Sequence, residues 1–480
     1  MKFASTTISS STKALILLSA SILTACGGGG GDATTAGNGI QTTANTSDST
    51  IHTTVKLQQL FDQGGAKVLP TYISHLIGTE KYPLAAVQIE NTGSQATLQV
   101  SADLPGYGSK NTRTVTIAAG ERKVIEISPI IDYARIFQNT TNLPATLSIS
   151  ISSGNNKIFE QSQQIQITGR NTVFWSNEGQ PTESFIATMV TPQDKGQSIQ
   201  DLLRGAANRF STGTGLVGYY SSQMPSATYS PEPGKYREES MYLLAGDTPN
   251  VTIKRISASL TATEDAHVFI LDNENYQKFS SGQPWIPCGI KNNAVAGSVI
   301  ECQAAPSAGN YHIIYQNPYS FMTRNIERTR TMSKWETTYY QAQAIFEELR
   351  ARGLVYVNLT GTGFFSSSQN VRYPSESLAG QGANCIDGSL LFASALEAMG
   401  MEPIIAMSRT AGHAFTAVRC WQGSTDCVIP IETTMIGGSA SFGTAYGQGV
   451  TEWNTWLSGG HLISLDIKAA RTAGVTPAPM

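Results

Sequence analysis

Hydrophobic and polar residues alternate with a period of two over much of the first third of the chain. Residues 97–102, 114–117 and 145–150 show the pattern, and turn residues such as those at 91–93 separate them. Such alternation predicts strands with one buried face. Several short strands at this spacing predict a β-sandwich-like domain over residues 51–170.

The pattern then changes twice. Ile199, Leu202 and Ala206 recur at helical spacing, which predicts a helix within residues 171–218. Alternation returns over residues 219–320 and predicts a second β-rich domain, also sandwich-like, inserted ahead of the last third of the chain.

A clear helical pattern begins at Ser333, which has Glu336 at capping-box spacing. Apolar side chains follow at steps of three and four, and Gly353 stands where a helix ends. The apolar stripe consists of Trp335, Tyr339, Ala342, Phe346 and Leu349. A stripe at this spacing is more typical of a core than of a binding surface, so we expect it to be buried.

The first 26 residues predict a secretion signal, with a short apolar run over residues 14–23 after two lysines. Residues 23–26, Leu-Thr-Ala-Cys, resemble the lipobox of bacterial lipoproteins, in which Cys26 becomes the lipidated first residue. An ordinary signal peptide with a chance cysteine is the alternative. Residues 27–50 are rich in Gly, Thr, Asn and Ser and predict a flexible tether. In known lipoproteins, an Asp directly after the lipidated cysteine favours retention at the inner membrane. Gly27 stands at that position here, so we expect a lipid anchor in the bacterial cell envelope, at the outer membrane.

Charged residues make up 14% of the chain, against about a quarter in an ordinary soluble domain. This balance favours a β-rich exported protein. The formal net charge is −3, and no cluster of cations occurs outside the N-terminus. Nucleic acid is therefore not expected as a partner.

Apart from Cys26, the chain has five cysteines, and an exported protein meets an oxidising compartment. Cys288 and Cys302 are close in sequence, and Cys420 and Cys427 flank a turn-like stretch, so we expect both pairs to form disulfides. Cys385 is then left over as a free thiol. Other pairings, or a buried inert cysteine, are the alternatives.

Cys385 follows a Gly-Ala-Asn turn and begins an apolar helix that ends near Gly400. The N-terminus of a helix carries partial positive charge and free N–H groups, which favour a thiolate and can stabilise an oxyanion. Asp387, in the first turn, is expected to be a helix-terminal charge. No metal or other cofactor is expected, because the histidines are scattered and Cys385 and His413 lack further zinc ligands.

His413 follows a glycine at the start of a predicted strand, about 28 residues after Cys385. A neutral imidazole near the thiol would accept its proton. The next predicted strand, residues 428–434, contains Glu432, whose carboxylate could fix the tautomer of the imidazole. A helix and two strands thus carry cysteine, histidine and acid in that order.

The Asn-Cys-Ile-Asp, Gly-His-Ala-Phe and Pro-Ile-Glu-Thr-Thr segments within residues 371–437 resemble the core of the transglutaminase-like superfamily, in the papain-like group. The resemblance implies an α+β papain-like catalytic core over residues 321–480, with residues 171–218 as the helical start of the same domain. It implies Cys385 as nucleophile, His413 as general base and then acid, and Glu432 as the orienting acid, where the family usually has Asp. Gln381 is the candidate for an upstream oxyanion donor.

Three functions compete. The first is an enzyme that hydrolyses or transfers peptide or isopeptide amide bonds through a thioester on Cys385, with hydrolysis favoured and proteins, peptides or cell-wall peptides as substrates. The second is a catalytically silent module that binds a peptide or a cell-wall component. The third is a purely structural surface protein, which the concentrated Cys–His–Glu pattern disfavours.

Overall fold

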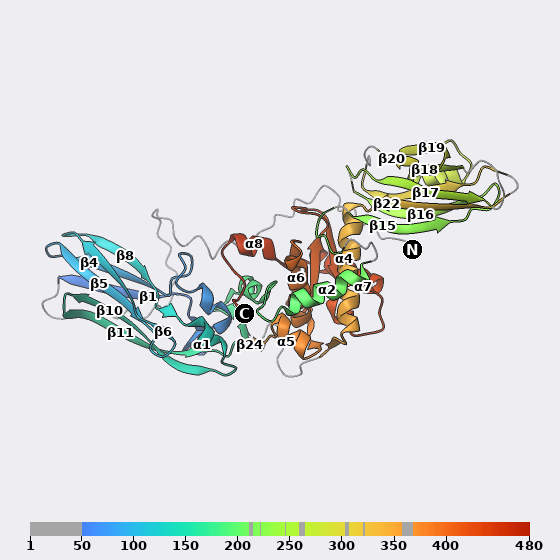
Figure 1. The fold of residues 1–480 in the computed structure, drawn as a ribbon. Coiled ribbons are helices and arrows are strands. Elements are labelled where there is room, and N and C mark those ends of the chain that lie inside the picture. Colours follow the sequence, from blue (N-terminus) through green and yellow to red (C-terminus); the bar gives the residue numbers. More distant parts are fainter. Residues whose placement is uncertain are drawn as a thin grey trace. The chain divides into compact units, whose positions relative to one another are not determined.

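The computed structural model describes residues 50–210, 215–220, 222–244, 246–258, 265–302, 307–319, 322–357 and 368–480. The predicted signal peptide, Cys26 and nearly all of the tether lie outside these residues. None of the helices in the described ranges is long and apolar enough to cross a bilayer. The chain forms two compact units, each built from more than one stretch of sequence (Figure 1).

The structure is mostly β, with 40% of residues in strands and 25% in helices, and the strands form many small sheets. The expected α+β papain-like class, with its two β-sandwich-like additions, is therefore wrong. That class was extrapolated from one helix and two strands around Cys385. The other alternating segments of the sequence pair as short strands in many small sheets, and these strands make the structure mostly β.

Of the described residues, unit 1 comprises 50–59, Gly78–Ile130 and Thr146–Gln163. Here β4 lies between β1 and β8, and β5 pairs with β7 and β10, all antiparallel. Alternate side chains such as Leu98 and Val100 of β5 are fully buried, which is the period-two pattern of the sequence. The strands that lie wholly or partly in this unit are β1 (Ile51–Leu57), β4 (Ala85–Asn91), β5 (Ala96–Asp103), β6 (Gly108–Ser109), β7 (Asn111–Ile117), β8 (Arg122–Ile127), β9 (Ile130–Ile131), β10 (Leu143–Ser153) and β11 (Asn156–Ile167).

Unit 2 contains the remaining residues. Its first segments are short, and the end of β11 pairs in parallel with β3. At the start of α2 (Ser198–Arg209), the side chain of the preceding Asp194 accepts hydrogen bonds from Ser198 N and Ile199 N. This acid thereby satisfies the first free N–H groups of the helix. The elements are β2 (Phe61–Gln63), β3 (Ala66–Leu69), η2 (Thr71–Leu76), α1 (Tyr133–Phe137), β12 (Thr172–Phe174), β13 (Ser176–Asn177), β14 (Gln180–Pro181), η3 (Glu183–Met189) and α2 (Ser198–Arg209).

The next part of unit 2 is formed by two four-stranded sheets, β15-β22-β17-β20 and β16-β21-β18-β19. A buried ion network joins it to the start of α4, because Arg330 contacts Glu239 at 2.7 Å and Glu336 at 2.8 Å. The Cys288–Cys302 disulfide lies here, as predicted. The elements are β15 (Gln223–Tyr229), β16 (Tyr236–Leu243), β17 (Asn250–Ala258), β18 (Ala266–Asp272), α3 (Asn273–Ser280), β19 (Gly289–Ala294), β20 (Val299–Glu301), β21 (Gly309–Gln316) and β22 (Arg324–Thr331).

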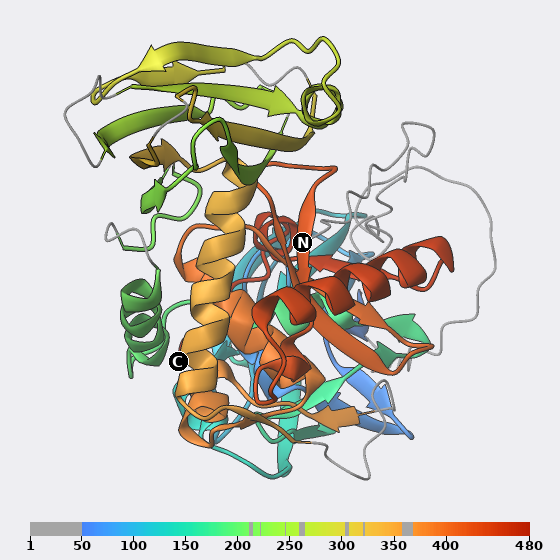
Figure 2. The ribbon, with the colours of Figure 1, turned by 90° about the vertical axis from the view of Figure 1, so that its right-hand side faces the viewer.

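The last part of unit 2 packs helices around an antiparallel sheet of order β28-β27-β26-β29. The capping box at Ser333 and Glu336 is present, and the stripe on α4 packs in the core, as predicted. The long α4, gold in Figure 2, runs beside α2. The elements are α4 (Lys334–Ala351), β23 (Val355–Tyr356), β24 (Ser368–Asn370), α5 (Pro374–Ala379), β25 (Gly382–Ala383), α6 (Cys385–Ala398), β26 (Pro403–Ser408), β27 (His413–Arg419), β28 (Val428–Ile431), η4 (Thr433–Met435), α7 (Phe442–Ser458), β29 (Ile463–Asp466) and α8 (Ile467–Thr472).

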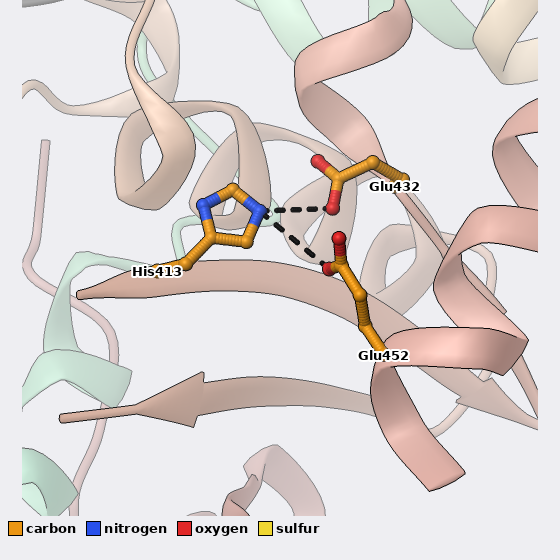
Figure 3. A group of neighbouring side chains, drawn as sticks. All are labelled: His413, Glu432 and Glu452. Carbon is orange, nitrogen blue, oxygen red and sulfur yellow. Dashed lines mark hydrogen bonds and ion pairs between the residues drawn. The ribbon is translucent and has the colours of Figure 1, made fainter. Parts of the chain in front are cut away.

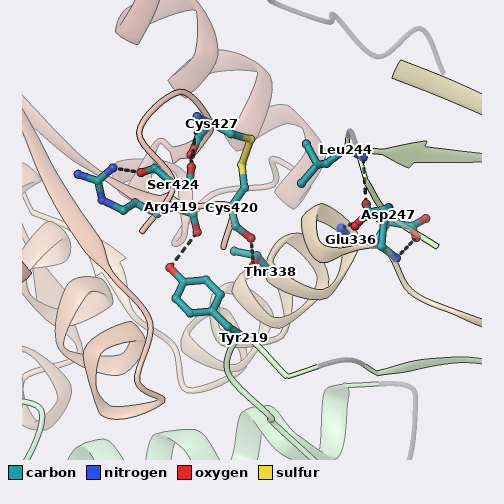
Figure 4. The surroundings of a disulfide bond; sticks show 10 residues. Tyr219, Leu244, Asp247, Glu336, Thr338, Arg419, Cys420, Ser424 and Cys427 are labelled. Carbon is teal, nitrogen blue, oxygen red and sulfur yellow. Dashed lines mark hydrogen bonds between the residues drawn. A yellow bond between two sulfur atoms is a disulfide. The ribbon is translucent and has the colours of Figure 1, made fainter. Parts of the chain in front are cut away.

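The Cys420–Cys427 disulfide closes the loop between β27 and β28, as predicted (Figure 4). Thr338 of α4 donates a hydrogen bond to the Cys420 carbonyl at 2.8 Å, and Tyr219 donates one to the Arg419 carbonyl at 2.9 Å. These bonds attach the end of the hairpin to α4 and to the segment around Tyr219. At the ends of β27 and β28 that lie away from the disulfide, the hairpin carries His413 and Glu432.

Candidate active site

Cys385 is the first residue of α6, and its thiol is free and buried, with the residue 7% exposed. Asn384 caps the helix by accepting a hydrogen bond from Asp387 N at 2.9 Å. The carboxylate of Asp387 accepts in return from Asn384 N and from Arg372 N, at 3.3 and 2.8 Å. The cap fixes the turn that starts at Cys385, and the thiol lies where the positive end of the helix is expected.

Asp387 is fully buried, and this raises the pKa of its carboxyl to about 6, although the hydrogen bonds from Arg372 and Asn384 oppose the shift. Its role is the one expected from the sequence, a helix-terminal charge. The carboxylate also attaches the segment before α5 to the start of α6.

His413 begins β27 and contacts both other predicted residues. Its Nε2 donates a hydrogen bond to Glu432 Oε2 at 2.9 Å (Figure 3). The imidazole also makes a hydrogen bond with Cys385, and Nδ1 is the ring nitrogen that remains for it. Burial opposes the charge on the imidazole. The hydrogen bonds with Cys385 and Glu432 and the negative charges of both outweigh it and raise the pKa of His413 to about 10. His413 is therefore an imidazolium at neutral pH.

Glu432 follows the last residue of β28 and is 2% exposed. Its Oε1 accepts from Thr434 N at 2.9 Å and from the Thr434 hydroxyl at 2.6 Å, while Oε2 faces His413. Burial opposes ionisation, but the hydrogen bond and the charge of His413, together with the Thr434 hydroxyl, hold the pKa of Glu432 below its usual range. The strand thus ends three residues earlier than the sequence indicated, at Ile431, and the acid caps a 3-10 turn.

A fourth residue, Glu452 of α7, was not predicted. Its Oε2 lies 3.7 Å from His413 Nε2 (Figure 3). Its Oε1 accepts a hydrogen bond from Gln448 at 2.8 Å. In the sequence, Glu452 is the one charged residue in the span that forms α7. A lone charge on an otherwise uncharged helix was the available signal, but nothing in the spacing related it to His413.

Gln381, the predicted oxyanion donor, does not join the cluster. It is exposed, has a φ of 48°, and its amide donates to the Arg352 carbonyl at 2.7 Å. This bond attaches it to the end of α4. Tyr356 is electrostatically coupled to the cluster: burial first, and then the charges of Cys385 and Glu432, raise the pKa of its phenol.

His413, Glu432 and Glu452 offer three possible ligand atoms within 4.8 Å of one another. Within the protein, Glu432 already accepts from His413 and from Thr434, and Glu452 accepts from Gln448. We therefore interpret the three side chains as a hydrogen-bonded, proton-sharing group.

No family model matches the chain, and no curated protein matches it. Among solved structures, the chain is similar to the secreted serine protease VesC from Vibrio cholerae, with 10% identity, a TM-score of 0.15 and 50% of this chain covered. The chain spans 45% of the length of that protease. It is also similar to a structure titled as a promiscuous carbohydrate-binding module of the β-sandwich superfamily, with 10% identity, a TM-score of 0.13, and coverage of 50% of this chain and 89% of the module.

Proposed function

We propose that this chain is a cell-envelope lipoprotein whose thiol site cleaves or transfers amide bonds through a thioester on Cys385, with the chemistry of a transglutaminase-like Cys–His–acid site. The observation that carries the proposal is the relay from Cys385 through His413 to Glu432. It combines a free thiol at a capped helix start, an imidazolium hydrogen-bonded to it, and a buried carboxylate on the opposite imidazole nitrogen. The lipoprotein part rests on residues 23–26.

In the first half of the reaction, the Cys385 sulfur attacks the carbonyl carbon of the substrate amide as a thiolate. The first N–H groups of α6 are placed to stabilise the oxyanion. The carbon–nitrogen bond then breaks, and His413 gives its proton to the leaving amine. The products of this half are a thioester on Cys385, a free amine and a neutral imidazole.

In the second half, the neutral His413 takes a proton from a water molecule or from an acceptor amine, which attacks the thioester carbon. The carbon–sulfur bond breaks, and the cysteine leaves as a thiolate beside the restored imidazolium. Water gives hydrolysis and an amine gives transfer. Glu432 fixes the imidazole with Nδ1 toward the sulfur in both halves. The exported location favours peptides or cell-wall peptides as substrates, and water as the common acceptor.

The test is alkylation of Cys385 by iodoacetamide over a range of pH, on protein that begins after Cys26. Wild type is compared with His413→Ala and with His461→Ala, a matched change at an exposed histidine. We expect one thiol that reacts fast at neutral pH, slowed roughly tenfold or more in His413→Ala only. Mass spectrometry of tryptic peptides identifies the labelled cysteine, and thermal denaturation confirms that each variant is folded.

Slow alkylation of wild type, or a Cys385 found in a disulfide, would end the catalytic proposal. The silent peptide- or cell-wall-binding module would then take its place. If His413→Ala and His461→Ala react alike while both are folded, His413 does not activate the thiol.

A further inference from the structure

Two carboxylates face one imidazole nitrogen in the candidate site. Glu432 Oε2 is 2.9 Å from His413 Nε2 and Glu452 Oε2 is 3.7 Å from it. The Nε2 atom carries one proton, and the shorter contact shows that Glu432 receives it. The Oε2 atom of Glu452 is buried and has no hydrogen-bond partner. A buried carboxylate oxygen without a donor is costly, so a second proton is needed in this group.

Within the described ranges, His413 is the one cationic group that acts on Glu452. The groups that act on it are Gln448 of its own helix, Glu432 at the end of β28 and His413 on β27. From α4, which also packs on α7, Tyr339 contacts Phe442 and Tyr446, near the other end of α7. Two ionised carboxylates within 4.8 Å of each other would share a single imidazolium.

We propose that Glu452 is a second acidic partner of the thiol site, which shares a proton with Glu432 and so sets the amount of negative charge beside His413. In the protonated form, the Glu452 carboxyl group donates toward Glu432, and its buried oxygen is satisfied. In the ionised form, it adds a second negative charge 3.7 Å from the imidazole. Glu452 acts through His413 and is a positioning residue.

The catalytic consequence rests on the proposed function. His413 must give up its proton when the amine leaves, and a second carboxylate charge makes the imidazolium a weaker acid. Protonated Glu452 therefore favours proton transfer to the leaving group, and ionised Glu452 opposes it. Burial and the charge of Glu432 raise the pKa of Glu452 to about 7, which places the change within the physiological range.

The test is a pH titration of the His413 ring by NMR, with the histidines labelled with carbon-13 at Cε1 and the signal assigned by its absence in His413→Ala. Wild type is compared with Glu452→Gln and with Glu232→Gln, which makes the same change at an exposed glutamate. We expect a step in the His413 signal near pH 7 in wild type and Glu232→Gln, and no step in Glu452→Gln. The main titration of the ring should also move down in Glu452→Gln, by roughly one unit.

A second variant tests the same inference with Glu452 in place, in case Glu452→Gln does not fold. Gln448→Leu removes the amide that donates to Glu452 Oε1 from an exposed position on α7. Because that hydrogen bond lowers the pKa of Glu452, we expect the step to remain and to move to higher pH.

The inference is overturned if wild type shows no step, if the step persists in Glu452→Gln, or if EDTA abolishes it, since a bound metal ion would then account for it. Failure of the proposed function is a separate result. If the step is present but Cys385 does not react with iodoacetamide, Glu452 shares its proton as proposed and the catalytic reading of the thiol is wrong.

Discussion

Replacing Glu432 with Gln tests the link between the acid and the imidazole directly. The glutamine has the same length, and its oxygen can still accept from Thr434 N. Its amide nitrogen is a donor, and it cannot receive the proton that His413 Nε2 now gives to Oε2 at 2.9 Å. The imidazolium therefore loses its charged acceptor, and the neutral imidazole gains an N–H donor for its Nε2 lone pair.

The magnitude follows from the burial of the pair. Glu432 is 2% exposed, and a hydrogen bond to a charged group contributes about 1.5–3 kcal/mol. At about 1.4 kcal/mol for each pKa unit, the pKa of His413 should fall by roughly one to two units from about 10. Because the imidazolium of the variant loses its proton at lower pH, we also expect the alkaline loss of turnover to begin at lower pH than in wild type.

The assay is the pKa of His413 from its Cε1–H resonance, with Glu402→Gln as the control. Glu402 is another buried glutamate, 4% exposed, which contacts Arg419 and Lys468. Glu402→Gln should lower thermal stability without moving the pKa of His413. An unchanged His413 pKa in folded Glu432→Gln protein would refute the assignment of Glu432.

Three further variants test the framework of unit 2. Arg330→Met leaves the buried carboxylate of Glu336 without a cationic partner and leaves Glu239 with Arg328 alone, and chemical denaturation should show a loss of about 3–5 kcal/mol in unfolding free energy. Asn384→Ala removes the cap of α6; it should cost about 1 kcal/mol by the same measurement and slow alkylation of the thiol. Asp387→Asn tests a pH effect. The pKa of this acid is near 3.8 when unfolded and about 6 when folded, so ionisation favours the unfolded chain. Below about pH 4 the group contributes nothing, and from pH 4 to 6 wild type should lose roughly 3 kcal/mol relative to the variant, in paired denaturation curves.

Local signals in the sequence were the reliable ones. The capping box at Ser333, the helix that starts at Cys385 and the Cys420–Cys427 hairpin depend on residues close together in the chain, and all are present. Such features need no knowledge of long-range packing, because caps and short disulfide loops are satisfied within a few residues.

The errors came from long-range arrangement. The fold class was wrong because one local pattern was extended to a chain whose strands pair in many small sheets. Gln381 was placed by its proximity to Cys385 in sequence, but its positive φ turns it toward the Arg352 carbonyl. Glu452 lies 39 residues from His413 along the chain, and only the packing of α7 near β28 brings it to the imidazole.

The precision of the site comes from hydrogen bonds between the three elements that carry it. Ser389 of α6 has its hydroxyl 3.4 Å from that of Thr433, the neighbour of Glu432, and its carbonyl accepts from Thr416 of β27 at 3.0 Å. One residue on the helix of Cys385 thus contacts both the strand of His413 and the turn of Glu432. Because these contacts are buried, movement of any one element would leave polar groups without partners. Glu432 is long enough to accept from Thr434 N in its own turn and from the imidazole of His413. The free-energy cost of moving any one element keeps the sulfur, the imidazole and this carboxylate in fixed positions relative to one another.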